Sequence, residues 1–192
     1  SSSSLKLDMG DTGTLSFSNG AGTTGISAYD DKMPTAGEEV WDDLDGQASG
    51  VATISNKGTI GYAGSFGPVG VSASYNKDDK ASPTTTAGSS HSLVVSMSPA
   101  DGVSAFIGTG DKSGSTANNG TDMYTAGVTY TAGAFTLGFQ TTDIDVSAVN
   151  GDTDRNHLAA SFAVNENMSI SYGMSTVGFE DSGFIRIGTE VM

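Results

Sequence analysis

The sequence predicts an all-β fold, an antiparallel up-and-down sheet with short turns at one end and long loops at the other. Three observations predict it. Apolar residues alternate with small polar residues in segment after segment. No segment longer than ten residues keeps a helical period, and tight turns alternate with long connections along the chain.

The strands follow from the alternation, taken in chain order. In each strand the apolar residues fall mainly at every second position, and the residues between them, which form the other parity, are mostly Gly, Ser and Thr. Each strand therefore has one apolar face and one small polar face. The clearest apolar parities are Ile60-Tyr62-Phe66, Val69-Val71-Ala73-Tyr75, Leu93-Val95-Met97, Tyr124-Ala126-Val128-Tyr130, Phe135-Leu137-Phe139 and Met168-Ile170-Tyr172-Met174. Strands are expected at residues 3–9, 14–19, 58–66, 69–76, 92–98, 103–109, 123–131, 135–142, 156–163, 168–175 and 183–190.

The connections define the order of these strands in space. Turn-forming residues predict tight turns at 10–13, 67–68, 99–102, 132–133 and 165–167. Long loops are expected at 20–57, 77–91, 110–122, 143–155 and 176–182. This places all tight turns at one end of the sheet and all long loops at the other, the plan of outer-membrane barrels.

Composition excludes several classes of protein. The 192 residues carry 22 acidic and 8 basic side chains, a net charge of −14, so the chain is unsuited to bind the phosphate backbone of a nucleic acid. The absence of cysteine excludes disulfides, thiolate catalysis and zinc sites built on cysteine. No apolar run is long enough for a membrane-spanning helix.

Charge and aromatic placement favour a barrel in a membrane. With these strand boundaries, only Lys6, Asp8, Arg186 and Glu190 are charged residues inside strands. Aromatic residues gather near strand ends, as in the two interfacial girdles of such barrels: Phe66, Tyr130, Phe135 and Phe162 near tight turns, and Tyr62, Tyr75 and Tyr124 near long loops. Since single-chain bacterial barrels have even strand numbers, eleven strands predict that residues 1–192 are an internal piece of one barrel domain.

The chain resembles the general bacterial porins, most closely those of alphaproteobacteria. The resemblance rests on Leu5 to Phe17 with its first tight turn, the outsized loop that follows, and the hairpin rhythm beyond it. It implies a sixteen-stranded outer-membrane barrel that assembles as a homotrimer, of which strands 4 to 14 are present. It also implies that residues 20–57 are the third loop, which folds into the channel and narrows it.

The loop at 20–57 is the main candidate site. It contains seven carboxylates, those of Asp30, Asp31, Glu38, Glu39, Asp42, Asp43 and Asp45. Folded into a channel, they would create a negative potential that favours cations. The alternative is a solvated surface loop.

Three charged residues lie on the polar parity of their strands, and so on the expected lumen wall. They are Lys6, Asp8 and Arg186. Similar porins place basic side chains on the wall opposite an acidic loop, which makes Lys6 and Arg186 candidates for that role. A plain salt bridge with a neighbouring carboxylate such as Asp8 is the alternative.

No metal, cofactor or catalytic residue is expected. Asp143, Asp145, Asp152 and Asp154 offer oxygen ligands for calcium, but their spacing misses the EF-hand pattern, and solvated turn residues are the simpler interpretation. The two histidines, His91 and His157, have no plausible nucleophile beside them in sequence.

The sequence thus predicts a passive outer-membrane diffusion channel for small hydrophilic solutes, with a preference for cations. The rival interpretation is a secreted or surface-displayed adhesin, a Ser/Thr/Gly-rich β-sandwich or solenoid that binds glycans. The two differ in the apolar parity, which faces lipid in a barrel and a second sheet in a sandwich.

Overall fold

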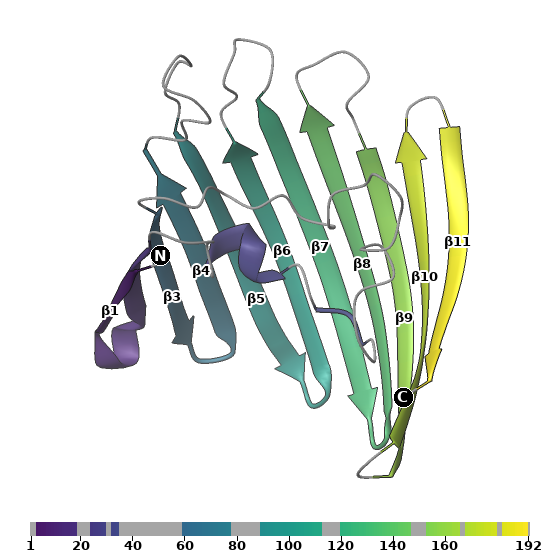
Figure 1. Cartoon of the computed structure of the whole chain (residues 1–192). Coiled ribbons are helices and arrows are strands. Elements are labelled where there is room, and N and C mark those ends of the chain that lie inside the picture. Colours follow the sequence, from purple (N-terminus) through teal and green to yellow (C-terminus); the bar gives the residue numbers. More distant parts are fainter. Residues whose placement is uncertain are drawn as a thin grey trace.

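A computed structural model describes residues 3–18, 24–29, 32–34, 59–77, 89–112, 120–146, 153–165, 168–179 and 182–191. Eleven strands form one antiparallel sheet in which each strand pairs with the next along the chain (Figure 1). They are β1 (Ser4–Asp8), β2 (Thr14–Ser18), β3 (Thr59–Phe66), β4 (Val69–Asn76), β5 (Ser90–Ala100), β6 (Val103–Lys112), β7 (Thr121–Ala132), β8 (Phe135–Val146), β9 (Thr153–Asn165), β10 (Met168–Phe179) and β11 (Ser182–Val191). Two short 3-10 helices, η1 (Gly10–Thr12) and η2 (Gly25–Tyr29), are the helical elements of the described residues.

The predicted all-β fold and strand order are confirmed, but the expected strand ends are wrong at the long-loop side. Strands β5 to β10 extend two to four residues further toward the loops than the alternation predicted, since β9 begins at Thr153 and β10 ends at Phe179. The loop expected at 176–182 is therefore mostly strand, and only two residues separate β10 from β11. Near the loops the outward positions carry charged or small polar residues, so no apolar outer parity marks these strand ends.

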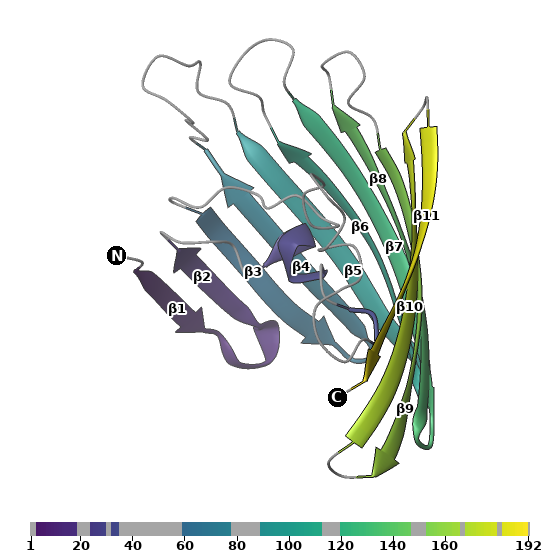
Figure 2. The same cartoon turned by 45° about the vertical axis from the view of Figure 1, so that its right-hand side comes forward.

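Register assigns every strand position to one of two faces. Lys6 pairs with Ser16, Ser16 with Gly61, and Gly61 with Ser74, so one cross-strand ladder runs along the small polar parity. The sheet is curved, and η2 lies on its concave side (Figure 2). Because η2 contacts Ser72 and Ser92, the polar parity forms the concave, inner face.

The convex, outer face exposes the apolar parity. Among its side chains, Leu5 is 66%, Ile107 67%, Leu137 51% and Ile170 46% exposed. A β-sandwich would bury this parity against a second sheet, whereas the described strands form a single sheet whose apolar side faces outward. Such a surface is stable against lipid or a neighbouring subunit.

Aromatic residues mark both edges of the apolar outer surface. Phe66, Tyr130 and Phe135 are half exposed near the tight turns, and Tyr75 and Tyr124 lie nearer the loops, as expected. Tyr62 lies near the middle of β3, slightly closer to its loop end. Its hydroxyl donates a hydrogen bond to the carbonyl of Thr12 in the first tight turn, at 2.6 Å, because the β1–β2 hairpin is short and brings that turn beside the middle of β3.

Charged side chains border the apolar outer surface on the side of the long loops. His91, Asp111, Asp122 and Asp145 follow one another in a single outer-face ladder from β5 to β8. The strands therefore hold more charges than expected, but the additional ones lie near the ends beside the loops. On β8, Phe135 and Asp143 are eight residues apart, which is about 27 Å along a strand and about 21 Å along the normal at a tilt of about 40°.

The pairings run from β1 to β11, and within the described residues none joins these two strands, so the sheet is open. No helix in the described part of the chain is long and apolar enough to cross a membrane.

Candidate functional site

The candidate site is the inner face together with the part of the 20–57 loop that lies on it. The backbone N–H of Gly25 donates to the hydroxyl of Ser72 at 2.8 Å, and that of Ile26 donates to the hydroxyl of Ser92 at 2.9 Å. Ser92 is further bonded to Ser74 at 2.7 Å. Side-chain hydroxyls of the wall thus bind the first two backbone amides of η2, which the 3-10 hydrogen bonds within that helix leave unpaired.

Apolar side chains on the inner face complete the site for η2. Ile26 is fully buried and packs in one cluster with Val94, Phe106 and Met123, which come from β5, β6 and β7. These three residues occupy the otherwise polar parity. Burial of an isoleucine side chain stabilises by roughly 1.5–3 kcal/mol. We call Val94, Phe106, Met123 and the two hydroxyls of Ser72 and Ser92 the loop seat.

Tyr29, the last residue of η2, adds contacts on the other side of the loop seat. Its ring lies 5.0 Å from that of Phe106, and its hydroxyl donates to Ser96 at 3.0 Å. Its backbone carbonyl accepts a hydrogen bond from the amide of Gln140 at 3.2 Å. The segment 24–29 is therefore bonded to strands from β4 to β8.

Glycines on the wall make room for this segment. A Cβ at Gly110 would lie 3.3 Å from the side chain of Ile26, and one at Gly138 would lie 2.6 Å from Pro34 and 2.8 Å from Met33. Gly25 has a φ of +66°, which side-chain-bearing residues rarely adopt, and its Cα faces the hydroxyls of Ser74 and Ser92. The described part of the loop thus crosses the inner face from β3 toward β8.

The seven predicted constriction carboxylates lie outside the described residues. They are Asp30, Asp31, Glu38, Glu39, Asp42, Asp43 and Asp45. Their described neighbours are Tyr29 before them and Lys32, Met33 and Pro34 among them. Lys32 is exposed, with its Nζ 5.1 Å from the centre of the Tyr29 ring.

The predicted wall residues all lie on inner-face ladders. Lys6 and Asp8 are exposed on β1, and the carboxylate of Asp8 accepts a hydrogen bond from the amide of Gly10 at 2.9 Å. Asp8 therefore stabilises the first tight turn. On β11 the backbone of Arg186 pairs with Ser175, which pairs with His157, so its register position belongs to the same ladder as His157.

A polar group on the inner face of β8 and β9 was not predicted from the sequence. Arg155 is 6% exposed, His157 is fully buried, and Gln140 lies opposite His157 in the register. The prediction started this strand at 156 and left Arg155 in a loop. Thr153, Arg155, His157 and Ala159 are all buried on one parity, but residues 153–157 are polar on both parities, so the sequence offered no signal there.

The calcium candidates lie on the outer face where the structure describes them. Asp143 pairs with Asp154 across β8 and β9, and Asp145 pairs with Asp122 of β7. Asp152 lies outside the described residues. In the described part of the chain, no group of three or more His, Cys, Asp or Glu side chains is arranged to hold a metal ion.

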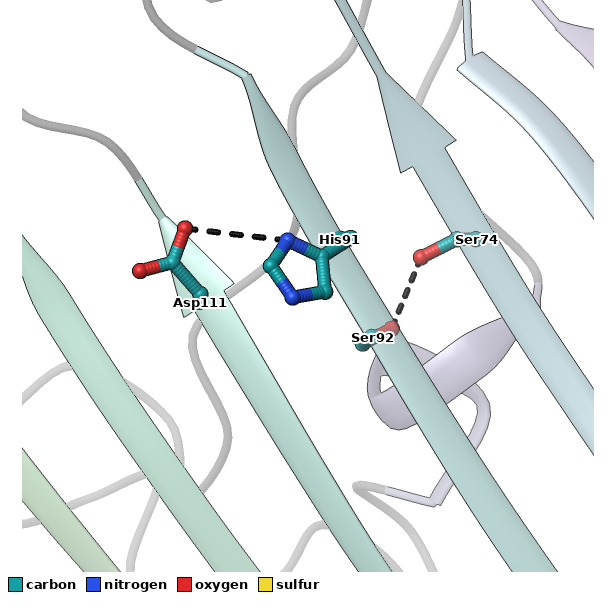
Figure 3. Close-up of polar contacts among 4 residues, drawn as sticks. All are labelled: Ser74, His91, Ser92 and Asp111. Atoms are coloured by element: carbon teal, nitrogen blue, oxygen red, sulfur yellow. Dashed lines mark hydrogen bonds and ion pairs between the residues drawn. The ribbon is translucent and has the colours of Figure 1, made fainter.

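Ser92, His91 and Asp111 are the residue types of a Ser-His-Asp catalytic triad, but the structure does not bring them together as one. His91 and Asp111 lie beside each other, with His91 Nδ1 3.8 Å from the Asp111 carboxylate, and Ser92 is next to His91 in the chain (Figure 3). Neighbouring residues of a strand point to opposite faces. His91 is exposed on the outer face and Ser92 is buried on the inner face, where it binds η2. The serine and histidine therefore do not form a nucleophile and base.

Comparisons with known proteins agree with this geometry. A family model described as Gram-negative porin matches residues 1–182. The fold is similar to that of a loop L8 deletion mutant of OmpT, an outer membrane protein of Vibrio cholerae, with a TM-score of 0.62 and 16% identity over 87% of this chain and 59% of that one. It is also similar to a solved porin, with a TM-score of 0.56 and 17% identity over 94% of this chain and 77% of that one. A search among curated proteins found no match.

Proposed function

Because the chain belongs to the Gram-negative porin family of the outer membrane, we propose that it forms part of a passive diffusion channel for small hydrophilic solutes and ions. The chain spans 59% of the length of the similar Vibrio cholerae protein, so the channel is a property of the whole protein. We propose that this protein assembles as a homotrimer in outer-membrane lipid, and no cofactor or catalytic step is required.

The channel proposal rests on the difference between the two faces of the sheet. The convex face has the apolar side chains that lipid or a second subunit would cover, as the exposure of Leu137 and Ile107 indicates. Most of the remaining concave face, outside the loop seat, is lined by Ser, Thr and Gly, which hydrate well and leave space for solutes. A passage for hydrated solutes along the concave face follows from this division.

We further propose that residues 20–57 narrow the channel and give it a preference for cations. The support is the loop seat, which holds residues 24–29 against the inner face. The chain that continues from Tyr29 has seven carboxylates within sixteen residues, from Asp30 to Asp45. A negative potential at a narrow point, within low-dielectric walls, attracts cations and excludes anions.

The inner face also carries basic residues on β9 and β11. Arg155 lies on the inner face of β9, and Arg186 occupies an inner-face register position on β11. Acidic residues on the loop and basic residues on this wall would produce a field across the passage rather than along it. We propose Arg155 in addition to Lys6 and Arg186 as a wall residue of the channel.

Planar-bilayer recording of the full-length protein tests the channel. We expect discrete conductance steps and a protein that needs detergent to stay monodisperse. A protein that is monodisperse without detergent and gives no steps would rule out the channel and favour the adhesin.

Selectivity tests the loop separately. Changing Asp42, Asp43 and Asp45 together to Asn should move the reversal potential in a salt gradient toward zero, because three negative charges leave the narrow point. Replacing Asp78 and Asp79 of another loop by Asn is the matched control, and we expect no change. A reversal potential unaffected by the triple change would remove this loop from the constriction.

A further inference from the structure

Two adjoining cavities lie on the inner face at the tight-turn end of the sheet. The larger, of about 580 Å³, surrounds the turn between β5 and β6 and reaches β7. The smaller, of about 250 Å³, lies between β3, β4 and β5. Both are open hollows lined by Ser98 and Ser104, so they adjoin at these two residues, and we call the pair the vestibule. The larger hollow alone falls within the size range of small-molecule sites.

The lining of the vestibule is rich in hydroxyls. Six side-chain hydroxyls contribute to it, those of Ser65, Ser96, Ser98, Ser104, Thr129 and Thr131. Among the described residues no basic and no aromatic side chain lines it, and one carboxylate, Asp101, lies at its edge in the turn. The hydroxyl of Tyr29 bonds to Ser96 and connects the vestibule to the loop seat above it.

This chemistry selects a class of solute. A hydroxyl donates one hydrogen bond and accepts up to two, so an array of hydroxyls satisfies a ligand that both donates and accepts at many positions. An anion finds no positive partner among the described residues that line the vestibule. A cation finds one carboxylate at the margin, in contrast to the seven on the loop.

We propose that the vestibule is a weak binding site for neutral polyhydroxylated solutes of hexose size. The proposal rests on the channel function proposed above and names one class of solute for it. The channel would then select solutes at two places: by charge at the loop, and by hydrogen bonding to hydroxyls at the vestibule.

The test is the block of ion current by a solute in a planar bilayer containing the full-length protein. Glucose is compared with triethylene glycol dimethyl ether, which has nearly the same mass and accepts but does not donate hydrogen bonds. Glucose should reduce the potassium conductance with a saturating dependence on concentration. The ether should reduce it only in proportion to its effect on bulk conductivity.

Variants locate the site. Ser98→Ala, Ser104→Ala and Thr129→Val together should raise the half-saturating glucose concentration by about threefold or more, because each lost hydroxyl removes a weak hydrogen bond. If the triple variant does not fold, Ser98→Ala alone is the test. Ser98 lines both cavities, and its loss should give a smaller rise in the half-saturating glucose concentration. Ser161→Ala with Ser169→Ala, two inner-face positions that line neither cavity, is the matched control and should leave the value unchanged.

The outcomes separate the two proposals. If glucose and the ether act alike, or if the triple variant and wild type give the same half-saturation, the vestibule is not a binding site although the channel stands. If the protein gives no conductance at all, the channel fails and the vestibule with it. An unchanged reversal potential in the triple variant is expected, since no charge has been altered.

Discussion

The loop seat makes Ile26 the residue on which the position of the 20–57 loop depends most. Ile26 is fully buried between Val94, Phe106 and Met123, and changing it to Ala removes most of this packing. Such a change in a core costs about 2–5 kcal/mol. The lower value applies here, because a short segment on an open wall can settle into the vacated space more easily than a closed core.

A loss of about 2 kcal/mol raises the ratio of unseated to seated loop by roughly 30-fold. If the wild-type loop is unseated about one part in a hundred, the variant loop would be unseated in about a quarter of the channels. Ile26→Ala should therefore increase open-channel noise and mean conductance in single-channel recordings. It should also raise the size limit for oligosaccharides in liposome-swelling measurements.

Ile107→Ala is the matched control. Ile107 follows Phe106 directly and is 67% exposed on the outer face, so the same atoms are removed outside the loop seat. We expect wild-type conductance, noise and size limit. If Ile26→Ala also matches wild type while both variants fold and insert, then residues 24–29 do not hold the loop on the wall, and the apolar cluster is a packing feature alone.

Three further predictions concern the wall itself. Val128 lies near the middle of the outer apolar surface, so Val128→Arg should destabilise the membrane-inserted protein by about 2–4 kcal/mol. Thr129→Arg, on the inner face, should change the stability little. Denaturant titration in lipid vesicles measures the difference in stability between the two variants. A Cβ at Gly110 would lie 3.3 Å from Ile26, so the larger side chain of Gly110→Leu should displace η2. The conductance of the Gly110→Leu channel should then resemble that of Ile26→Ala, whereas the conductance of Gly110→Ala should stay near wild type. Gly127→Ala should lower the unfolding midpoint, because its methyl group would overlap the ring of Phe106.

The fold was largely predictable because its main cause is repeated along the sequence. A period of two assigns residues to faces, and a shift by one residue would exchange the faces completely. Leu137 and Phe139 pair with Ala160 and Leu158 as their shared parity requires. Tight turns such as that at Pro68 fix which strands are neighbours, so the order of the sheet follows from the chain.

The ends of the strands were less predictable for a related reason. Beyond the apolar outer surface, outward positions carry charge, as at Asp122 and Asp154, and the contrast between the two parities disappears. Backbone pairing continues nevertheless, because hydrogen bonds in the ladder do not depend on side-chain polarity. Arg155 was lost from the prediction in this way, whereas His157 falls inside the strand expected at 156–163.

The loop seat was predictable in principle from exceptions to the alternation. Val94, Phe106 and Met123 are apolar residues on the polar parity of three consecutive strands. The register brings Gly108 opposite Val94 and Gly127 opposite Phe106, so each large inner side chain has space beside it. No single exception is informative, but exceptions that fall at compatible register positions on adjacent strands indicate that something covers the inner face there.

The inner face and the outer face are therefore under different physical constraints. Between the tight turns and the charged ladder at the loop side, lipid or a subunit requires apolar side chains on the outer face, and this is why the outer parity is regular enough there to reveal the fold. Water in a passage tolerates any hydrated side chain, so the inner parity is free to carry a loop seat in one region, basic residues such as Arg155 in another, and the hydroxyls of Ser98 and Ser104 in a third. Departures from a regular inner lining are accordingly the positions where we expect substitutions to change what passes through the channel, while substitutions of the outer parity change whether the protein inserts.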